Sequence, residues 1–144
     1  MSAIFDPALA RRLARDIEGD VLFDDASRGR YSTDASIYQI LPVGVVVPRT
    51  EDDVATAIAI AREAGIPVLP RGAGTSQCGQ TVGAALVIDT SKHLNRVVEI
   101  DADARTVRVE PGVVLDRLNA QLRPMGLWYP VDVSTAAQAT IGGM

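Results

Sequence analysis

A short glycine-rich segment at residues 71–79 is the part of the sequence best suited to hold a ligand. Its glycines permit positive φ angles and let main-chain N–H groups approach a ligand without a Cβ atom in the way. Successive N–H groups in such turns form a concave nest that suits diphosphate oxygens. The hydroxyl side chains add donors, and the arginine adds positive charge. The segment consists, in order, of Arg71, Gly72, Ala73, Gly74, Thr75, Ser76, Gln77, Cys78 and Gly79.

A plain surface turn between two strands is the alternative interpretation of this segment, and many glycine-rich loops are of that kind. Two features favour a ligand site. The segment follows an expected buried strand, and α/β proteins place ligands at strand ends. The residues after it, at 85–88, again form a strand pattern. Dinucleotide-fold and Walker loops lead into a helix instead, so any phosphate here would be held by loop amides alone.

A strand–helix–strand unit positions this loop. The β-branched run at residues 43–47 predicts a strand buried on both faces. Thr50 is an expected N-cap, followed by a helix that ends near Gly65. A second apolar strand is expected at residues 66–69. Such a βαβ unit makes its two strands parallel.

The flanking segments predict the rest of an α+β fold. Asp6 and Pro7 begin a first helix, and residues 24–42 form an ordered connection. Alternating residues at 96–109 predict a β-hairpin with one solvated face. An amphipathic helix follows, and the tail at 128–144 is expected to be irregular. The fold class is therefore a βαβ unit with parallel strands plus a β-hairpin and flanking helices.

Composition limits the function classes. The chain has 144 residues, of which 47% are hydrophobic and 22% charged, and its net charge is −4. These values suit one folded domain, and the acidic balance argues against nucleic acid as a partner. The longest apolar run, at 43–47, is too short for a transmembrane segment. With a single cysteine, Cys78, and no secretory pattern at its start, the chain is expected to be cytoplasmic.

Residues 70–79 resemble the FAD pyrophosphate loop of the vanillyl-alcohol oxidase and p-cresol methylhydroxylase (PCMH) superfamily, in the branch of D-lactate, glycolate and D-2-hydroxyglutarate dehydrogenases. The order of several further segments is more specific than the loop alone. They are residues 31–38, 48–54, 87–91, 109–113, 129–132 and 139–144. The resemblance implies that residues 43–144 are the first part of a PCMH-type FAD-binding domain, truncated at the C-terminus, and that residues 1–42 are an N-terminal helix and connection.

The resemblance also implies the cofactor and its contacts. FAD would bind in an extended form, non-covalently, because Thr75 stands where some relatives attach the flavin to a histidine. The implied cofactor-binding residues are Pro70, Arg71, Gly72, Ala73, Gly74, Thr75, Ser76, Gly79, Pro130, Asp132, Ser134, Thr140, Ile141, Gly142 and Gly143. Residues 31–38 are similar to large bacterial members that carry an iron–sulfur module, which implies an iron–sulfur cluster elsewhere in the full-length protein.

The resemblance implies a flavin-dependent dehydrogenase of a small 2-hydroxy acid. The substrate cap of this family follows the flavin domain, so no catalytic residue is assigned here and the chain alone is expected to be inactive. One alternative is the flavin module of another oxidase or of a non-redox enzyme in the same superfamily. The other is a non-catalytic α/β interaction module, which leaves the shared order of segments unexplained.

Several other residues are of types found in functional sites, but their positions favour structural roles. His93, the single histidine, is expected in a solvated turn, and one histidine with one cysteine cannot form a zinc site. Cys78 is interpreted as a small loop side chain rather than a flavin attachment point. The acidic residues of the hairpin (Asp101, Asp103 and Glu110) fit its wet face. Trp128 and Tyr129 favour core packing over stacking on a ring.

Overall fold

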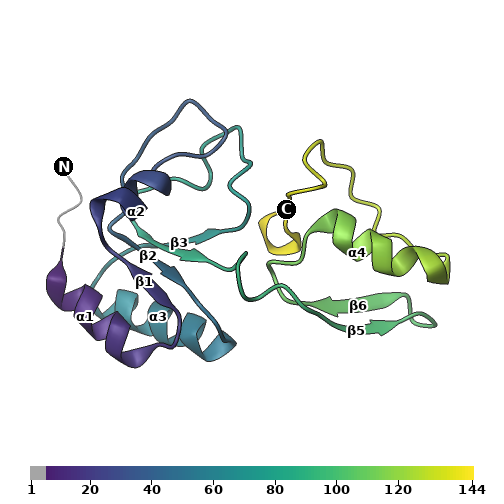
Figure 1. Ribbon diagram of the computed structural model, residues 1–144, viewed down its shortest axis with the longest axis horizontal. Helices are drawn as coiled ribbons and strands as arrows, with labels where there is room; N and C mark the ends of the chain where they lie inside the picture. Colours follow the sequence, from purple (N-terminus) through teal and green to yellow (C-terminus); the bar gives the residue numbers. More distant parts are fainter. Residues whose placement is uncertain (1–5) are drawn as a thin grey trace.

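A four-stranded sheet with both faces covered forms the first of two lobes in this computed structural model, which describes residues 6–144 (Figure 1). Its strands are β1 (Asp20–Leu22), β2 (Gly44–Val47), β3 (Val68–Arg71) and β4 (Leu86–Asp89), in the spatial order β1-β2-β4-β3. The last three are parallel, while β1 pairs antiparallel with β2. The predicted βαβ unit is confirmed, with β4 inserted between its two strands.

Successive residues of β2 and β4 point to opposite faces, and each face has its own core. Val46, Leu86 and Ile88 pack with α1 (Pro7–Asp16) and α3 (Glu51–Glu63) on one face. Val45 and Val87 pack on the other face, where α2 (Asp25–Arg30) contacts β2. The continuous β-branched run was therefore a correct indication of a strand buried on both sides.

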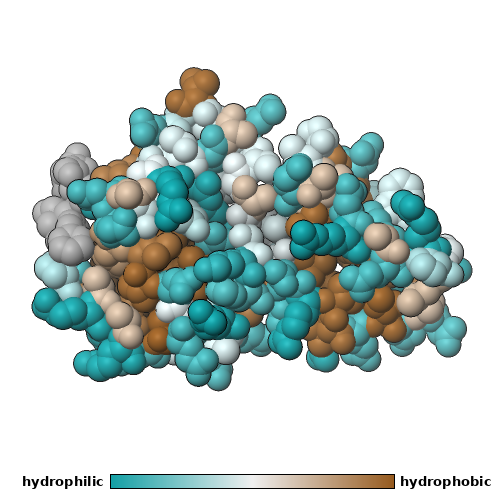
Figure 2. All heavy atoms as spheres, in the orientation of Figure 1, coloured by the Kyte–Doolittle hydropathy of each residue, from teal (hydrophilic) through white to brown (hydrophobic). Residues whose placement is uncertain are grey.

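The second lobe consists of a hairpin covered by one helix. β5 (Val97–Asp101) and β6 (Thr106–Val109) are antiparallel, with an irregularity in register between Val97 and Glu99. They pack against α4 (Leu115–Leu122) through a separate apolar cluster. The short 3₁₀ helices η1 (Arg123–Met125) and η2 (Ile141–Gly143) follow. On the face in Figure 2, apolar side chains gather in two areas, one over each lobe, with mainly hydrophilic and neutral residues between them.

The two predicted N-cap residues do cap their helices, whereas the short elements were not predicted. The Asp6 carboxylate accepts hydrogen bonds from the amides of Ala8 and Leu9, and Thr50 Oγ1 accepts one from the Asp53 amide. β1 and α2 were not predicted, because three and six residues are too few for a hydrophobic period. β3 lies two residues later than expected, since its ladder with β4 continues to Arg71. Within residues 6–144, no helix is long and apolar enough to cross a bilayer.

Asp53, a buried carboxylate in α3, connects the residues that follow α1 with those that follow β2. It is 3% exposed and accepts hydrogen bonds from the amides of Glu18 and Arg49, each at 2.8 Å. Burial by itself raises the pKa of Asp53, but the amide hydrogen bonds outweigh that effect and hold the pKa below its ordinary value. Asp53 therefore contributes stability above pH ~4, and this contribution is lost as the pH falls through the lowered pKa.

Replacing Asp53 with alanine is expected to lower the free energy of unfolding by about 3 kcal/mol at pH 7, because two amides lose their acceptor. The difference from wild type should shrink between pH 5 and pH 3. Urea denaturation at several pH values measures both. Asp52→Ala, at the neighbouring exposed position of the same helical turn, is the matched control. Equal losses in the two variants, or a loss at Asp53 that does not vary with pH, would contradict this role.

Candidate functional site

The glycine-rich loop and the C-terminal tail face each other across a groove of about 340 Å³ between the two lobes. The loop leaves the end of β3 at the sheet edge, and the tail returns from α4 toward it (Figure 1). The lining residues are Gly72, Ala73, Gly74, Thr75, Ser76, Gln80 and Thr81 from the loop, and Val133, Thr135, Ala139, Thr140, Gly143 and Met144 from the tail. Of these described residues, none has a charged side chain.

The main chain of the loop is open. Gly74 has φ +70°, a left-handed conformation that favours glycine. Within the described part of the chain, no hydrogen bond engages the main-chain amides of residues 72–76. The amides of Cys78 and Gln80 are partnered, because both donate to Ser76 Oγ. The five amides at the start of the loop therefore have no hydrogen-bond partner within residues 6–144.

Thr140 brings the tail into contact with the loop. Its side chain is buried, and Thr140 Oγ1 has no hydrogen-bond partner among residues 6–144. A methyl group added at Gly72 would overlap this hydroxyl, so glycine is required there by close approach. A second contact joins Thr135 Oγ1 to Thr75 Oγ1 at 3.4 Å. Open amides and an unpaired buried hydroxyl on one groove fit a ligand rich in acceptor oxygens, such as a diphosphate.

Arg71 does not direct its charge into the groove. Its guanidinium donates to the carbonyl oxygens of Tyr31, Thr33 and Thr81 at 3.0–3.3 Å. It also lies 5.1 Å from the centre of the Tyr31 ring. The expectation that this side chain adds positive charge for phosphate is therefore not met in this conformation, in which Arg71 holds neighbouring main chain in place.

The tail residues divide between the groove and the second lobe. Thr140 and Gly143 line the groove. Ile141 packs into the core beneath α4, and Gly142 lies against Pro111, to whose carbonyl its amide donates at 2.8 Å. Among the remaining predicted residues, Pro70 lies in β3 and Gly79 packs against Tyr38. Pro130, Asp132 and Ser134 are not among the lining residues, and their contact with a cofactor stays a prediction.

The sequence interpretation missed Val133 and Thr135, which alternate with the tail residues that it named. The predicted cofactor-binding residues also left out Gln80, Thr81, Ala139 and Met144, although the last two lie in the segment 139–144 that the resemblance identified. No hydrophobic period marks which side chains of an irregular tail point inward. The only available signal was the hydroxyl of Thr135 next to Ser134.

Other residues singled out in the sequence have structural surroundings of their own. Asp101 and Asp103 are exposed in the hairpin turn. Glu110 is buried, contrary to expectation, because Arg96 pairs with it through its main-chain amide and its guanidinium. These bonds lower the pKa of Glu110. His93 is not fully solvated, since its Nε2 is buried 3.9 Å from Asp20 Oδ2.

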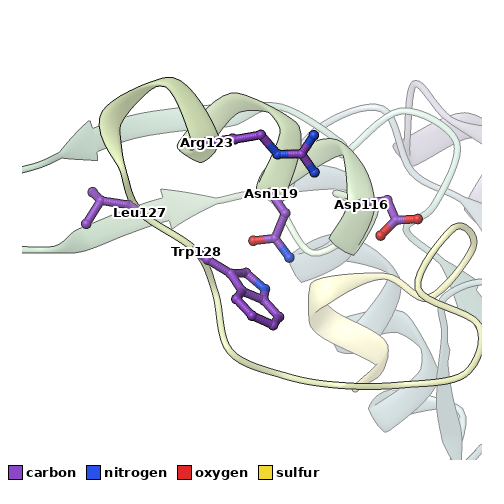
Figure 3. A pocket seen from close by; sticks show the side chains of 5 residues that line it. All are labelled: Asp116, Asn119, Arg123, Leu127 and Trp128. Carbon is purple, nitrogen blue, oxygen red and sulfur yellow. The ribbon is translucent and has the colours of Figure 1, made fainter.

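Of the aromatic pair in the tail, Trp128 lines a hollow of about 420 Å³ beside α4 that is distinct from the groove. Figure 3 shows the Trp128 indole next to Asn119, with Asp116 and Arg123 along the same helix. Trp128 is 66% exposed and Tyr129 36%, so the prediction that they anchor core packing was wrong. Asn119 holds this segment by accepting a hydrogen bond from the Tyr129 amide at 2.8 Å.

Comparison with known proteins gives consistent matches. Residues 42–144 match the family described as "FAD binding domain". D-2-hydroxyglutarate dehydrogenase of Pantoea ananatis is 45% identical over 134 residues, which cover 91% of this chain and 13% of that protein. Glycolate oxidase subunit GlcD of Bacillus subtilis is 40% identical, over 88% of this chain and 28% of the relative. The chain thus spans only a small part of the curated relatives that it matches.

Solved structures share the fold. An alkyldihydroxyacetonephosphate synthase superposes with a TM-score of 0.84 at 20% identity, over 99% of this chain and 29% of that chain. A variant of BBE-like 1 from Physcomitrella patens has a TM-score of 0.77 at 21% identity, over 94% of this chain and 29% of that one. The mixed parallel and antiparallel architecture predicted from the sequence is confirmed by these neighbours.

The close approach of loop and tail can be tested by substitution. Gly72→Ala is expected to lower the free energy of unfolding by about 2 kcal/mol, because the new methyl overlaps Thr140 Oγ1. Adding Thr140→Ala removes that oxygen and should restore most of the loss, since the remaining Cβ is 3.4 Å away. Thermal or urea unfolding of the single and double variants measures the coupling. Strictly additive effects would show that the loop and the tail do not meet as described.

Proposed function

The chain belongs to the FAD-binding domain family, and from this premise we propose that residues 72–76 and the facing tail hold the diphosphate of FAD. The observation that carries the proposal is the set of unpaired main-chain amides at residues 72–76, which line the groove opposite the unpartnered hydroxyl of Thr140. Both features match acceptor oxygens, and the close approach at Gly72 leaves no room for a side chain between them.

The role proposed for this chain is to bind and orient the flavin. When bound, FAD supplies the site that accepts a hydride from the substrate. The lining of the groove contributes amides and hydroxyls, with no acid or base that could move a substrate proton. Binding is proposed to be non-covalent, because Thr75 offers no ring nitrogen and Cys78 is exposed outside the groove lining.

The whole protein is proposed to be a flavin-dependent dehydrogenase of a small 2-hydroxy acid, of the D-2-hydroxyglutarate, glycolate or D-lactate type. The 45% identity to a D-2-hydroxyglutarate dehydrogenase supports this class. Residues 43–144 would then be the first part of its FAD-binding domain, preceded by the helix and connection at 1–42. A cytoplasmic location is part of the proposal, since an exposed free cysteine suits a reducing compartment.

Flavin binding can be tested at Gly74, where a Cβ would lie 2.5 Å from Arg71 Nη2. In the full-length gene product, we expect Gly74→Ala to weaken FAD binding about tenfold or more, because the loop amides must move. Gly65→Ala is the matched control, since Gly65 has a similar φ of +67° at the end of α3, with open space around it. Flavin fluorescence titration measures the dissociation constants. Equal affinities of the two variants would overturn the assignment of this loop.

The substrate class is tested by anaerobic reduction. We expect the absorbance of bound flavin to bleach on addition of D-2-hydroxyglutarate, D-lactate or glycolate, and not on addition of L-2-hydroxyglutarate or L-lactate. Acid precipitation should release the flavin into the supernatant, as expected for non-covalent binding. A protein that binds FAD but is reduced by none of these acids would exclude the dehydrogenase class while leaving the flavin site in place.

A further inference from the structure

The segment at residues 31–38, which we call the strap, lies against the glycine-rich loop. It connects α2 to β2, and Figure 1 shows it beside the connection between β3 and β4 at the upper edge of the first lobe. The strap precedes residue 42, where the match to the FAD-binding family begins. It is ordered by its own bonds, since the Ile40 amide donates to the Ser32 carbonyl at 2.9 Å and Thr33 bridges to Gln39.

Arg71 joins the strap to both ends of the loop. Its guanidinium donates to the carbonyls of Tyr31 and Thr33 in the strap and to that of Thr81 at the far end of the loop. The Tyr31 ring beneath the guanidinium is fixed in turn, because its hydroxyl donates to Asp89 Oδ2 at 2.7 Å. Burial, together with this carboxylate, raises the pKa of Tyr31, so the phenol remains protonated and keeps donating.

Asp34 forms the second connection. Thr81 Oγ1 donates to Asp34 Oδ2 at 3.0 Å, and the Ser36 amide donates to Asp34 Oδ1 at 2.8 Å. Burial raises the pKa of Asp34, but these hydrogen bonds outweigh it and hold the pKa below its ordinary value. At neutral pH the carboxylate is therefore ionised and accepts from both groups.

Tyr38 supports the loop at Gly79, close to its far end. A Cβ atom at Gly79 would lie 2.5 Å from Tyr38 Cδ2, so the ring packs directly on the loop main chain. The internal pairing of the loop centres on Ser76, whose Oγ accepts from the amides of Cys78 and Gln80 and donates to Gln80 Oε1. The strap adds contacts at Arg71, at Gly79 and at Thr81, and so holds the loop at both of its ends.

We propose that the strap is part of the cofactor site and that Asp34, acting through Thr81, positions the loop whose amides receive the diphosphate. This inference rests on the proposed function. Asp34 is not among the residues that line the groove, so its effect on the ligand must pass through the loop. The strap thus makes cofactor affinity depend on a segment outside the matched family domain.

A double-mutant cycle on the full-length gene product tests this. Asp34→Ala and Thr81→Val are each expected to weaken FAD and ADP binding about tenfold, and the double variant to be no weaker than either single variant, because one bond is broken in all three. Thr81→Ser keeps the hydroxyl and should retain wild-type affinity. Thr106→Val, at an exposed threonine in β6 of the other lobe, is the matched control.

The outcomes separate the two proposals. Failure of the wild-type protein to bind FAD or ADP would refute the proposed function itself. If the wild type binds but Asp34→Ala binds equally well, the strap plays no part in the site and the inference is overturned. Additive losses in the double variant would also overturn it, because Thr81 would then act on the ligand directly. Unfolding curves without ligand identify any variant that is not folded at the titration temperature, and the remaining single variant then decides.

Discussion

The main-chain amides of residues 72–76 are unpaired among the described residues, and the proposed function requires that the loop hold one shape without pairing them. Loops are usually held by pairing their own N–H groups, which would remove the donors a ligand needs. In this structure, a side chain supplies hydrogen bonds that hold the main chain around the loop. Arg71 binds three carbonyl oxygens with one guanidinium, so the acceptors around the loop are occupied while its amides stay open. A planar group with five donors suits this task better than an ammonium group does.

The elements that could be predicted are those with caps and long hydrophobic patterns. Thr50 caps the start of α3 and Gly65 lies just after its end, as expected. The β-branched run of β2 is buried on both faces. β3 was expected at residues 66–69, where the apolar residues lie, but the strand spans Val68–Arg71 and includes Pro70. The spatial order puts β3 at the edge of the sheet, where a proline without an N–H group is tolerated. Strand order is decided by pairing between distant segments, which a local pattern does not contain.

The same limit applies to the site. The residue types of the loop were enough to predict open amides, because glycine acts through its own backbone. The direction of the Arg71 side chain depends on carbonyls about forty positions earlier in the chain. The sequence therefore suggested a side chain that binds phosphate, whereas in the structure Arg71 donates to these main-chain carbonyls. In the tail, Ile141 and Gly142 face the second lobe while Thr140 and Gly143 face the groove. That division follows from the antiparallel bridge between Val114 and Thr140, which anchors the tail to the start of α4.

A groove lined by neutral donors has a consequence for the family as a whole. Under the proposed function, the amides and hydroxyls of the lining would contact the cofactor and not the substrate. The same scaffold can then serve different reactions, provided that the substrate is held by other parts of the protein. The relatives by sequence are named as a dehydrogenase and as an oxidase subunit. Under the proposed function, the scaffold must preserve the close approach of loop and tail at Gly72 and Thr140, because a side chain at Gly72 would overlap Thr140 Oγ1 beside the groove proposed for the diphosphate.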